Sequence, residues 1–332
     1  MYLRENADLQ SSLGIPSEMA GELSAAPLGQ GEHNANYTFA HPATGKLYVL
    51  RVNYISQLGL DDQIGYEYDA LKILEPSGCT PKAYYVDRSK QLDGHGALVM
   101  EHYEGEHMNL EDEEDVAQAA HMLADVHSLV PPNGCPLVHP ADPLKSQFEE
   151  CVGYVKFYRK SPLQDDMVNG YLDKMLEKAE EMLETPMREE DSYHILNTEA
   201  VPSHFLIPLD KTPGHFLDWE KPILGEVAQD VAYFLSPTTT IWDTDFIFDQ
   251  EQCEHFLDMY WDAVDGRFDR GSFDRRFQGH VVMNCLRGIT WSCRTWVEYH
   301  DPNRPLKNEK TFEKLKVYLS EEFLDLVYSR HF

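Results

Sequence analysis

The chain has 332 residues, of which 42% are hydrophobic and 11% aromatic, enough for sizeable cores in more than one domain. Its 57 acidic residues outnumber the 28 basic ones, and the formal charge of −29 disfavours nucleic acids and anionic membranes as partners, because both attract cationic surfaces. The charge has two interpretations: a solubility or high-salt adaptation of the surface, or an acidic trough that attracts a cationic substrate.

The sequence carries no pattern typical of export or membrane insertion. Its N-terminal run MYLRENADLQ lacks the apolar segment of a signal peptide, and the apolar runs at 46–52 and 96–100 are far shorter than a bilayer span. Six scattered cysteines form no CxxC pair. We therefore expect a cytoplasmic protein with reduced thiols.

The segment from residue 25 to about 103 has the texture of a small α+β region. Aromatic and β-branched residues predict strands, a Pro-Ala-Thr-Gly turn separates the first two, and one stretch has a helical period. The expected strands are 36–40, 47–52, 82–87 and 97–102, with the helix at 61–74.

Beyond the acidic run at 111–115 the periodicity becomes mostly helical. Amphipathic stretches predict helices at 116–129, 143–158 and 167–183 and again from 226 to the end, with short strands in 195–209 and 215–219 between them. We divide the chain into an N-terminal extension (1–24), a small lobe (25–106) and a helical lobe (107–332).

A glycine pair opens the first strand region. Gly29 and Gly31 lie in the run PLGQGEHNANYTF, where glycines allow close approach and backbone N–H groups can face phosphates. A lone Gly-x-Gly is weak support for that role, and an ordinary hairpin turn explains it about as well.

A cation stands within the apolar strand predicted at 47–52. Arg51 there needs a partner if it is buried, because an unpaired buried charge is costly, and Glu67 on the downstream helix is the candidate. The alternative is an edge-strand residue with its head group in water.

The most informative segment runs from Tyr193 to Glu220. Short apolar strands alternate with polar loops, which carry Glu199 and Asp218. Phosphoryl transfer needs a carboxylate that orients the attacking hydroxyl and hard oxygen ligands for Mg²⁺, and these two acids could supply them. Taken alone, the segment could equally be a pair of polar turns with capping acids.

The order of these segments is similar to that of the protein kinase fold. In detail the chain resembles the aminoglycoside phosphotransferase and choline/ethanolamine kinase-like family of small-molecule kinases. Asp218-Trp219-Glu220 stands where that family has its metal-binding Asp-Trp-Glu, Asp230-Val231-Ala232 resembles the Asp-Leu-Ala whose acid holds the catalytic loop, and 124–129 resembles its Leu-His-x-Leu helix. The resemblance spans nearly the whole chain from about residue 25.

The resemblance implies a bilobal fold, with an antiparallel-sheet N-lobe and a larger helical C-lobe, and a set of site residues. Glu199 takes the position of the catalytic base, and Asp218 that of the metal ligand, with His204 or Glu220 assisting. ATP or another NTP and Mg²⁺ or Mn²⁺ are the implied cofactors. The implied nucleotide-binding residues are Gly29 and Gly31 over the phosphates, Arg51 held by Glu67 on the α- and β-phosphates, and Met100 and Glu101 against the purine.

The catalytic loop departs from the family pattern, and Arg51 stands in place of the family's usual lysine. The family's loop runs His-Gly-Asp, four residues, then Asn, whereas this chain has Asn197-Thr198-Glu199 and His204 at the same spacing. Glu is one methylene longer than Asp, and a displacement of about 1 Å can cost on the order of 10² in rate. A histidine suits Mn²⁺ or Zn²⁺ better than Mg²⁺.

We therefore expect a phosphotransferase that acts on a hydroxyl of a small metabolite, such as an amino alcohol or aminosugar. A pseudokinase that binds nucleotide without turnover and an enzyme that transfers the nucleotidyl group are the alternatives. Aromatic residues near the C-terminus suggest either a box for a quaternary ammonium group or, more simply, core packing. They are Tyr260, Trp261, Trp291, Trp296 and Tyr299.

Overall fold

The computed structural model describes residues 1–31, 33–56, 58–188, 192–304 and 307–332. The chain forms two compact units, and its path passes from one to the other several times. Unit 1 comprises Met1–Glu106, Pro131–Leu137 and Leu206–Pro222, and unit 2 comprises His107–Val130, Val138–Phe205 and Ile223–Phe332.

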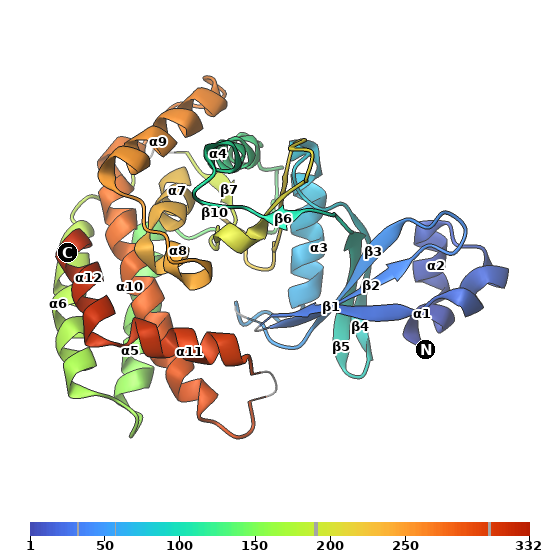
Figure 1. The fold of residues 1–332 in the computed structure, drawn as a ribbon, viewed down its shortest axis with the longest axis horizontal. Helices are drawn as coiled ribbons and strands as arrows, with labels where there is room; N and C mark the ends of the chain where they lie inside the picture. The colour runs from blue at the N-terminus through green and yellow to red at the C-terminus, as the bar shows by residue number, and fades with distance from the viewer. Residues whose placement is uncertain (32, 57, 189–191, 305–306) are drawn as a thin grey trace. The chain divides into compact units, whose positions relative to one another are not determined.

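A five-stranded antiparallel sheet forms the centre of unit 1 (Figure 1). Its order is β1 (Ala25–Gln30), β2 (Asn34–Ala40), β3 (Leu47–Asn53), β5 (His95–Glu101) and β4 (Ala83–Leu92). The register places Arg51 of β3 opposite Asn36 of β2 and Leu98 of β5. Helix α3 (Gln63–Leu74) begins after Asp62, whose side chain accepts a hydrogen bond from the Gly65 N–H, and the short 3₁₀ helix η2 (Glu75–Ser77) follows it.

Strand β3 is buried on both faces. Tyr48, Leu50 and Val52 point into a core formed with the N-terminal extension, where α1 (Tyr2–Glu5), α2 (Ala7–Leu13) and the 3₁₀ helix η1 (Ser17–Glu22) lie. Arg51 alternates to the opposite face, where it reaches α3. The apolar run from Leu47 to Leu50, which ends at Arg51, is consistent with that double burial.

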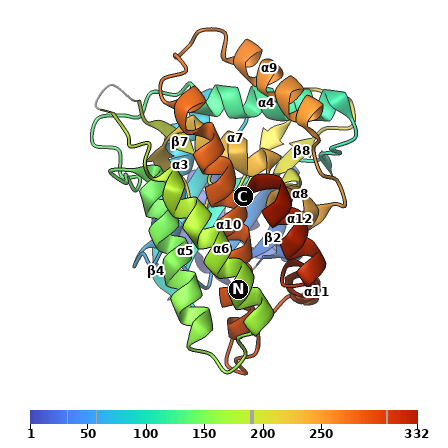
Figure 2. The ribbon, with the colours of Figure 1, turned by 90° about the vertical axis from the view of Figure 1, so that its left-hand side faces the viewer.

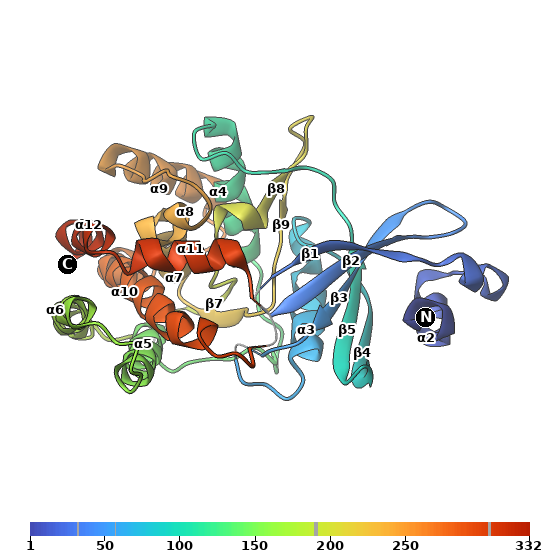
Figure 3. The ribbon, with the colours of Figure 1, turned by 60° about the horizontal axis from the view of Figure 1, so that its bottom comes forward.

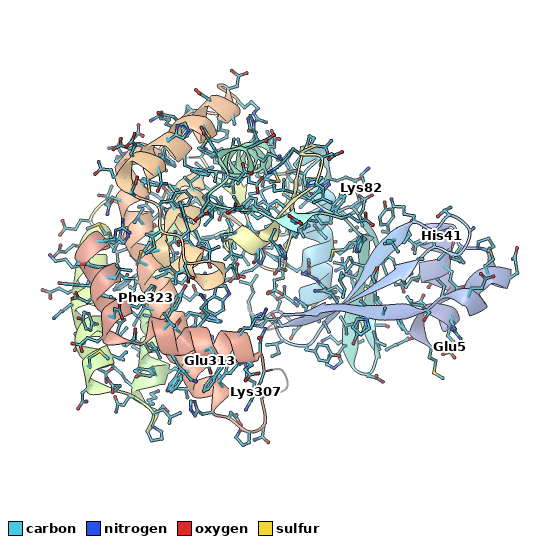
Figure 4. All side chains as sticks on the ribbon, viewed as in Figure 1. Glu5, His41, Lys82, Lys307, Glu313 and Phe323 are labelled. Carbon is cyan, nitrogen blue, oxygen red and sulfur yellow. The ribbon has the colours of Figure 1, made fainter. Side chains whose placement is uncertain are left out.

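Unit 2 is mainly helical, and α10 (Phe273–Tyr299) is its longest described helix. Helices α5 (Pro143–Arg159) and α6 (Asp166–Met182) pack beside it, as Figure 2 shows, and α12 (Glu321–His331) contacts α6 and α10 (Figure 3). Leucine, valine, methionine and cysteine side chains fill the core between them, together with Phe323, which Figure 4 labels. The other helices are α4 (Glu113–His127), α7 (Val227–Leu235), α8 (Pro237–Asp243), α9 (Gln250–Val264) and α11 (Glu309–Tyr318).

Short strands and one short 3₁₀ helix occupy the segments around 106 and 194–225. In unit 2, β7 (His194–Leu196) pairs antiparallel with β10 (Ile223–Gly225). Strands β6 (Glu106–His107), β8 (Phe205–Ile207) and β9 (His215–Phe216) are two or three residues long, and η3 (Pro202–His204) precedes β8. The expected strand over 215–219 is therefore too long, since Asp218 has a left-handed backbone with φ of 60°.

The antiparallel-sheet region with one helix and the mainly helical remainder agree with the predicted α+β class. The C-terminal aromatic residues do not form one box: Trp261 contacts Phe273, Trp291 contacts Trp242, and Trp296 stacks on Phe312. No helix among the described residues is both long enough and apolar enough to cross a membrane.

Candidate functional site

In unit 1, Arg51 lies between two carboxylates. Its Nη1 donates to Oε1 of Glu67 at 2.6 Å and to Oδ1 of Asp218 at 2.7 Å, and its Nε donates to Asn36 at 3.0 Å. Arg51 is 6% exposed and Glu67 is 1% exposed. The predicted pairing of Arg51 with Glu67 is confirmed, and the edge-strand alternative is wrong, because β3 lies between β2 and β5 in the sheet and Arg51 is buried.

The charges around Arg51 do not balance, since Glu67, Asp218 and Glu220 all act on one guanidinium. Burial raises the pKa of Glu67 to about 8, with Asp218 and Glu220 adding to the rise and Arg51 opposing it. Burial alone would lower the pKa of Arg51, but the three acids raise it further above its usual range, so the guanidinium stays charged. With Glu67 largely protonated at neutral pH, Asp218 and Glu220 still outnumber the single guanidinium, and this excess of negative charge would attract a cation.

The segment that carries Asp218 is anchored to the rest of unit 1 at several points. Gln63 of α3 donates to the carbonyl of Glu220 at 2.6 Å, and Tyr66 of the same helix donates to the carbonyl of Pro222. The Glu220 carboxylate is bonded by His33, at 3.2 Å, and by the Asn34 amide. Glu220 is 7% exposed, so these contacts place it against β2 rather than in solvent.

The glycine pair forms part of a tight hairpin. Gly29 lies within β1, and the Gly31 N–H donates to the carbonyl of Asn34 at 2.9 Å. Neither glycine has a positive φ, and a Cβ built at Gly29 meets no atom within 4 Å. The fold of the described residues therefore does not itself require glycine at these positions. Glu32 lies outside the described residues.

Met100 and Glu101, which are predicted to contact a purine, are the last two residues of strand β5. Met100 is buried and pairs across the sheet with Val49 of β3. The Glu101 carboxylate accepts hydrogen bonds from Lys46 and from the Tyr103 hydroxyl, both at 2.9 Å. The strand end is thus well ordered by side-chain contacts, and the purine contact stays a prediction.

In unit 2, Asp230 organises the polar loop that follows β7. Its carboxylate accepts the backbone N–H groups of Asn197 at 2.7 Å and Thr198 at 2.8 Å. Thr198 has a φ of 70°, which is strained for a β-branched residue and persists only when such contacts hold it. His127 bonds the Asp230 carboxylate at 3.4 Å, so it supports the loop through Asp230.

Glu199 lies next in this loop, and its carboxylate is paired. Asn197 accepts the Glu199 N–H at 3.0 Å through its side-chain oxygen, while Oε1 of Glu199 accepts from Nη2 of Arg287 at 3.2 Å. His204 points back at the loop, because its Nδ1 lies 2.7 Å from the Glu199 carbonyl, and a carbonyl only accepts. The Nδ1 proton therefore stabilises the loop.

Sequence reasoning missed Arg287 and its second partner, Glu150. Nε of Arg287 donates to Oε2 of Glu150 on α5 at 2.9 Å. The signal that could have found this residue is the one used for Arg51: a cation inside an apolar stretch, here VVMNCLRGITW of α10. It was overlooked because the same stretch also reads as an aromatic-rich core helix.

The donor set fits a divalent cation only in part. No group of three or more His, Cys, Asp or Glu in the described part of the chain is arranged to hold a metal ion. Asp218 offers the hard oxygen that Mg²⁺ prefers and its side chain is 28% exposed. Both carboxylate oxygens of Glu220 already accept protein donors, and His204 offers nitrogen.

The predicted site residues therefore fall in two groups. Unit 1 holds Gly29, Gly31, Arg51, Glu67, Met100, Glu101, Asp218 and Glu220, and unit 2 holds Glu199 and His204. Their catalytic, metal-binding and nucleotide-binding roles remain predictions, as do the domain limits at 24 and 106.

Comparison with known proteins gives one sequence-level match. The profile of the phosphotransferase enzyme family matches residues 24–274. No curated protein sequence matches the chain.

Many solved structures share the fold. An ethanolamine kinase of Plasmodium vivax superposes with a TM-score of 0.65 at 14% identity, covering 94% of this chain and 86% of that one. Spectinomycin phosphotransferase, solved with ADP and spectinomycin, gives 0.62 at 12% identity over 93% and 92% of the two chains. A choline kinase of Cryptosporidium parvum gives 0.60 at 12% identity over 93% and 91%. These likenesses confirm the predicted kinase-like fold.

Proposed function

Because the chain belongs to the phosphotransferase enzyme family, we propose that it transfers a phosphoryl group from ATP or another NTP to a hydroxyl of a small metabolite. The observation that carries the proposal is the position of Arg51, whose buried guanidinium bonds both Glu67 and Asp218. A fixed cation of this kind binds phosphate oxygens without further reorganisation, and positioning with electrostatic stabilisation supplies most of the catalysis in phosphoryl transfer.

The nucleotide would lie against the sheet of unit 1. The described fold does not need glycine at positions 29 and 31, because neither residue has a positive φ and a Cβ would clash at neither. This supports a role in which the absence of a side chain lets the backbone approach the phosphates closely. Met100 and Glu101 would contact the purine at the end of β5. Asp218 would hold Mg²⁺ or Mn²⁺, and the ion would neutralise charge on the phosphate oxygens.

Glu199 would orient the acceptor hydroxyl. Among the described residues no donor contacts its Oε2, whereas Oε1 is bonded to Arg287. The loop that presents Glu199 is held by Asp230, and the carboxylate is 19% exposed. An ordered acid with one available oxygen suits the task of accepting a hydroxyl proton.

For the acceptor we propose a small molecule that carries a positive charge. The charge of −29 and the ethanolamine and choline kinases among the structural relatives favour a cationic amino alcohol, and spectinomycin phosphotransferase favours an aminosugar-type ligand. We further propose a cytoplasmic protein with neither nucleic acid nor membrane as a partner, on the grounds of charge and of free cysteines.

The second candidate is a pseudokinase that binds nucleotide without turnover. The ion pair between Glu199 and Arg287 favours it, because the guanidinium already occupies one oxygen of the carboxylate. The Arg51–Asp218 pair similarly competes with a metal ion for Asp218.

Turnover separates the two candidates. The purified chain is incubated with ATP or GTP, Mg²⁺ or Mn²⁺, and amino alcohols, aminosugars and neutral polyols, with ADP release and product mass as readouts. We expect one acceptor to gain a single phosphate. A gain of AMP would instead assign nucleotidyl transfer.

Two isosteric variants serve as controls, Glu199→Gln for the proposed base and Asp218→Asn for the proposed metal ligand. Each should lower turnover on the order of 10²-fold or more without removing it entirely, while Glu199→Gln should keep nucleotide binding. If the wild-type chain binds nucleotide in a calorimeter but phosphorylates nothing, the pseudokinase candidate replaces the enzyme. If it binds no nucleotide, both candidates fail.

A further inference from the structure

Arg287 is a buried cation on the core helix α10. The residue is 6% exposed, and the ring of Tyr233 on α7 lies 5.9 Å from its Cζ atom. Burial alone would lower its pKa, but Glu150 and Glu199 raise it well above the usual range, so the guanidinium is charged. A charge this deep must have a structural or functional reason, because desolvating it is costly.

One edge of the guanidinium links two elements that are distant in sequence. Nε donates to Glu150 on α5 at 2.9 Å, and Nη2 donates to Glu199 in the loop at 3.2 Å. Glu150 is fixed in turn, because its Oε1 accepts the Tyr154 hydroxyl at 2.6 Å. The planar guanidinium is therefore held in one orientation by a rigid helix, and it imposes that orientation on Glu199.

Glu199 needs such a constraint more than an aspartate would. Its side chain has one more rotatable bond, so its carboxylate can sweep a larger volume and lose alignment with a hydroxyl. The bond from Arg287 holds Oε1, and Oε2 is left as the oxygen that no described donor contacts. Loop contacts through Asn197 and His204 fix only the Glu199 backbone.

We propose that Arg287 is a positioning residue: it holds Oε1 of Glu199 so that Oε2 receives the proton of the acceptor hydroxyl. Glu150 sets the orientation of Arg287. This inference rests on the proposed phosphotransferase function. A positioning role for Arg287 explains how a glutamate can serve at the base position, because the bond from the arginine restricts the longer side chain to one orientation.

The chain contains a matched control for Arg287 on the same helix. Arg294 lies two turns further along α10, and its Nε donates to Glu298 at 2.7 Å. Its Cζ atom lies 5.1 Å from the ring of Tyr154, which donates to Glu150, but in the described part of the chain Arg294 bonds neither Glu150 nor Glu199. Arg294→Met therefore removes a half-buried arginine and its ion pair with Glu298 from α10, and it leaves the contacts of the Glu199 loop unchanged.

The test compares Arg287→Met, Arg287→Lys and Arg294→Met in kcat, in KM for ATP and in thermal midpoint. We expect Arg287→Met to lower kcat on the order of 10²-fold with KM for ATP changed less than about twofold. Arg287→Lys should recover part of kcat, because an ammonium still reaches one carboxylate. Arg294→Met should keep kcat within about threefold, since the loop is untouched.

A double-mutant cycle then asks whether Arg287 acts through Glu199. Once Glu199→Gln has removed the base, adding Arg287→Met should lower the residual turnover no further, because the two residues act as a unit. Arg287→Met leaves two acids facing each other, so Glu150→Gln/Arg287→Met is made in parallel. That variant removes one of the surplus charges and keeps the test valid if the single variant fails to fold.

The outcomes separate this inference from the proposed function. If wild-type turnover is present but Arg287→Met and Arg294→Met lose equal kcat and equal thermal stability, Arg287 is merely structural and the inference is overturned. If Arg287→Met turns over faster than the wild type, Arg287 silences Glu199, which also overturns it. Nucleotide binding without any wild-type turnover refutes the proposed function itself, and this inference with it.

Discussion

Replacing Glu226 by glutamine tests the buried charge network that anchors α7, the helix that carries Asp230. Glu226 is 2% exposed and precedes α7 as its N-cap. Arg276 donates to both of its carboxylate oxygens, from Nε at 2.8 Å and from Nη2 at 2.7 Å. Ser272 and His280 donate as well, at 2.5 and 3.0 Å. Glutamine keeps the shape, removes the charge and turns an amide toward Arg276.

The expected loss follows from the protonation equilibrium of Glu226. Burial would raise its pKa, but the bonds from His280, Arg276 and Ser272 outweigh burial and lower it from 4.5 to about 2. That difference corresponds to roughly 3 kcal/mol of stability at neutral pH. For a unit of about 200 residues, a loss of this size lowers the thermal midpoint by about 6–12 °C.

The stabilising effect of Glu226 should depend on pH in a defined direction. Because its pKa is lower in the folded chain, the stabilisation is complete above pH 5 and is lost as the pH falls towards 2. In urea unfolding at pH 7, the free energy of unfolding of the wild type should exceed that of Glu226→Gln by roughly 3 kcal/mol. At pH 3.5 this difference should be smaller by roughly 1.4 kcal/mol.

An exposed acid supplies the control. Glu149 on α5 has only a 4.0 Å contact with Lys145, so Glu149→Gln should change the free energy of unfolding by less than about 0.5 kcal/mol. A gap between wild type and Glu226→Gln that is the same at both pH values would refute the argument, since the stabilisation would then not come from the carboxylate charge.

Three further predictions concern the candidate site. Asn34→Asp should lower the thermal midpoint, because it places two acids together. Adding Glu220→Gln should restore the midpoint, because the amide of residue 220 then donates to the acid of residue 34. If Glu220 binds the metal, this double variant should also lose Mn²⁺ affinity, measured by electron paramagnetic resonance. Asp230→Asn should lower the free energy of unfolding in urea by about 1.5–3 kcal/mol, because both backbone N–H groups lose a charged acceptor and one of them then faces the amide NH2 group; a change below about 0.5 kcal/mol would contradict this. Arg51→Met should weaken ADP binding in a calorimeter by at least tenfold, and Arg51→Lys by much less, whereas equal losses would show that charge is not the cause.

Several elements of the fold could be predicted from the sequence because their causes are local. The α3 helix follows from apolar spacing and from Asp62, which caps it, and the β2–β3 hairpin follows from the turn that contains Gly45. The alternation along β3 also placed Arg51 where a partner on α3 could reach it. Backbone geometry sets these periods, so a short window of residues suffices.

Candidate residues for the site could be chosen from the sequence, but of their pairings only that of Arg51 with Glu67 could be predicted. Glu199 and Asp218 stand out from their segments, yet Arg287 is 88 residues from Glu199 and 137 from Glu150. The engagement of Glu220 by Asn34 spans 186 residues. No local periodicity encodes such contacts, because they form only after helices and strands have docked.

The sequence by itself thus determined the order of the elements, the apolar faces and the acids that suit phosphoryl transfer. Only the tertiary structure decided which donors occupy those acids: Arg51 on Asp218, Asn34 on Glu220 and Arg287 on Glu199. The physical reason is desolvation. A buried carboxylate must find a donor wherever packing provides one, and packing is a property of the whole fold.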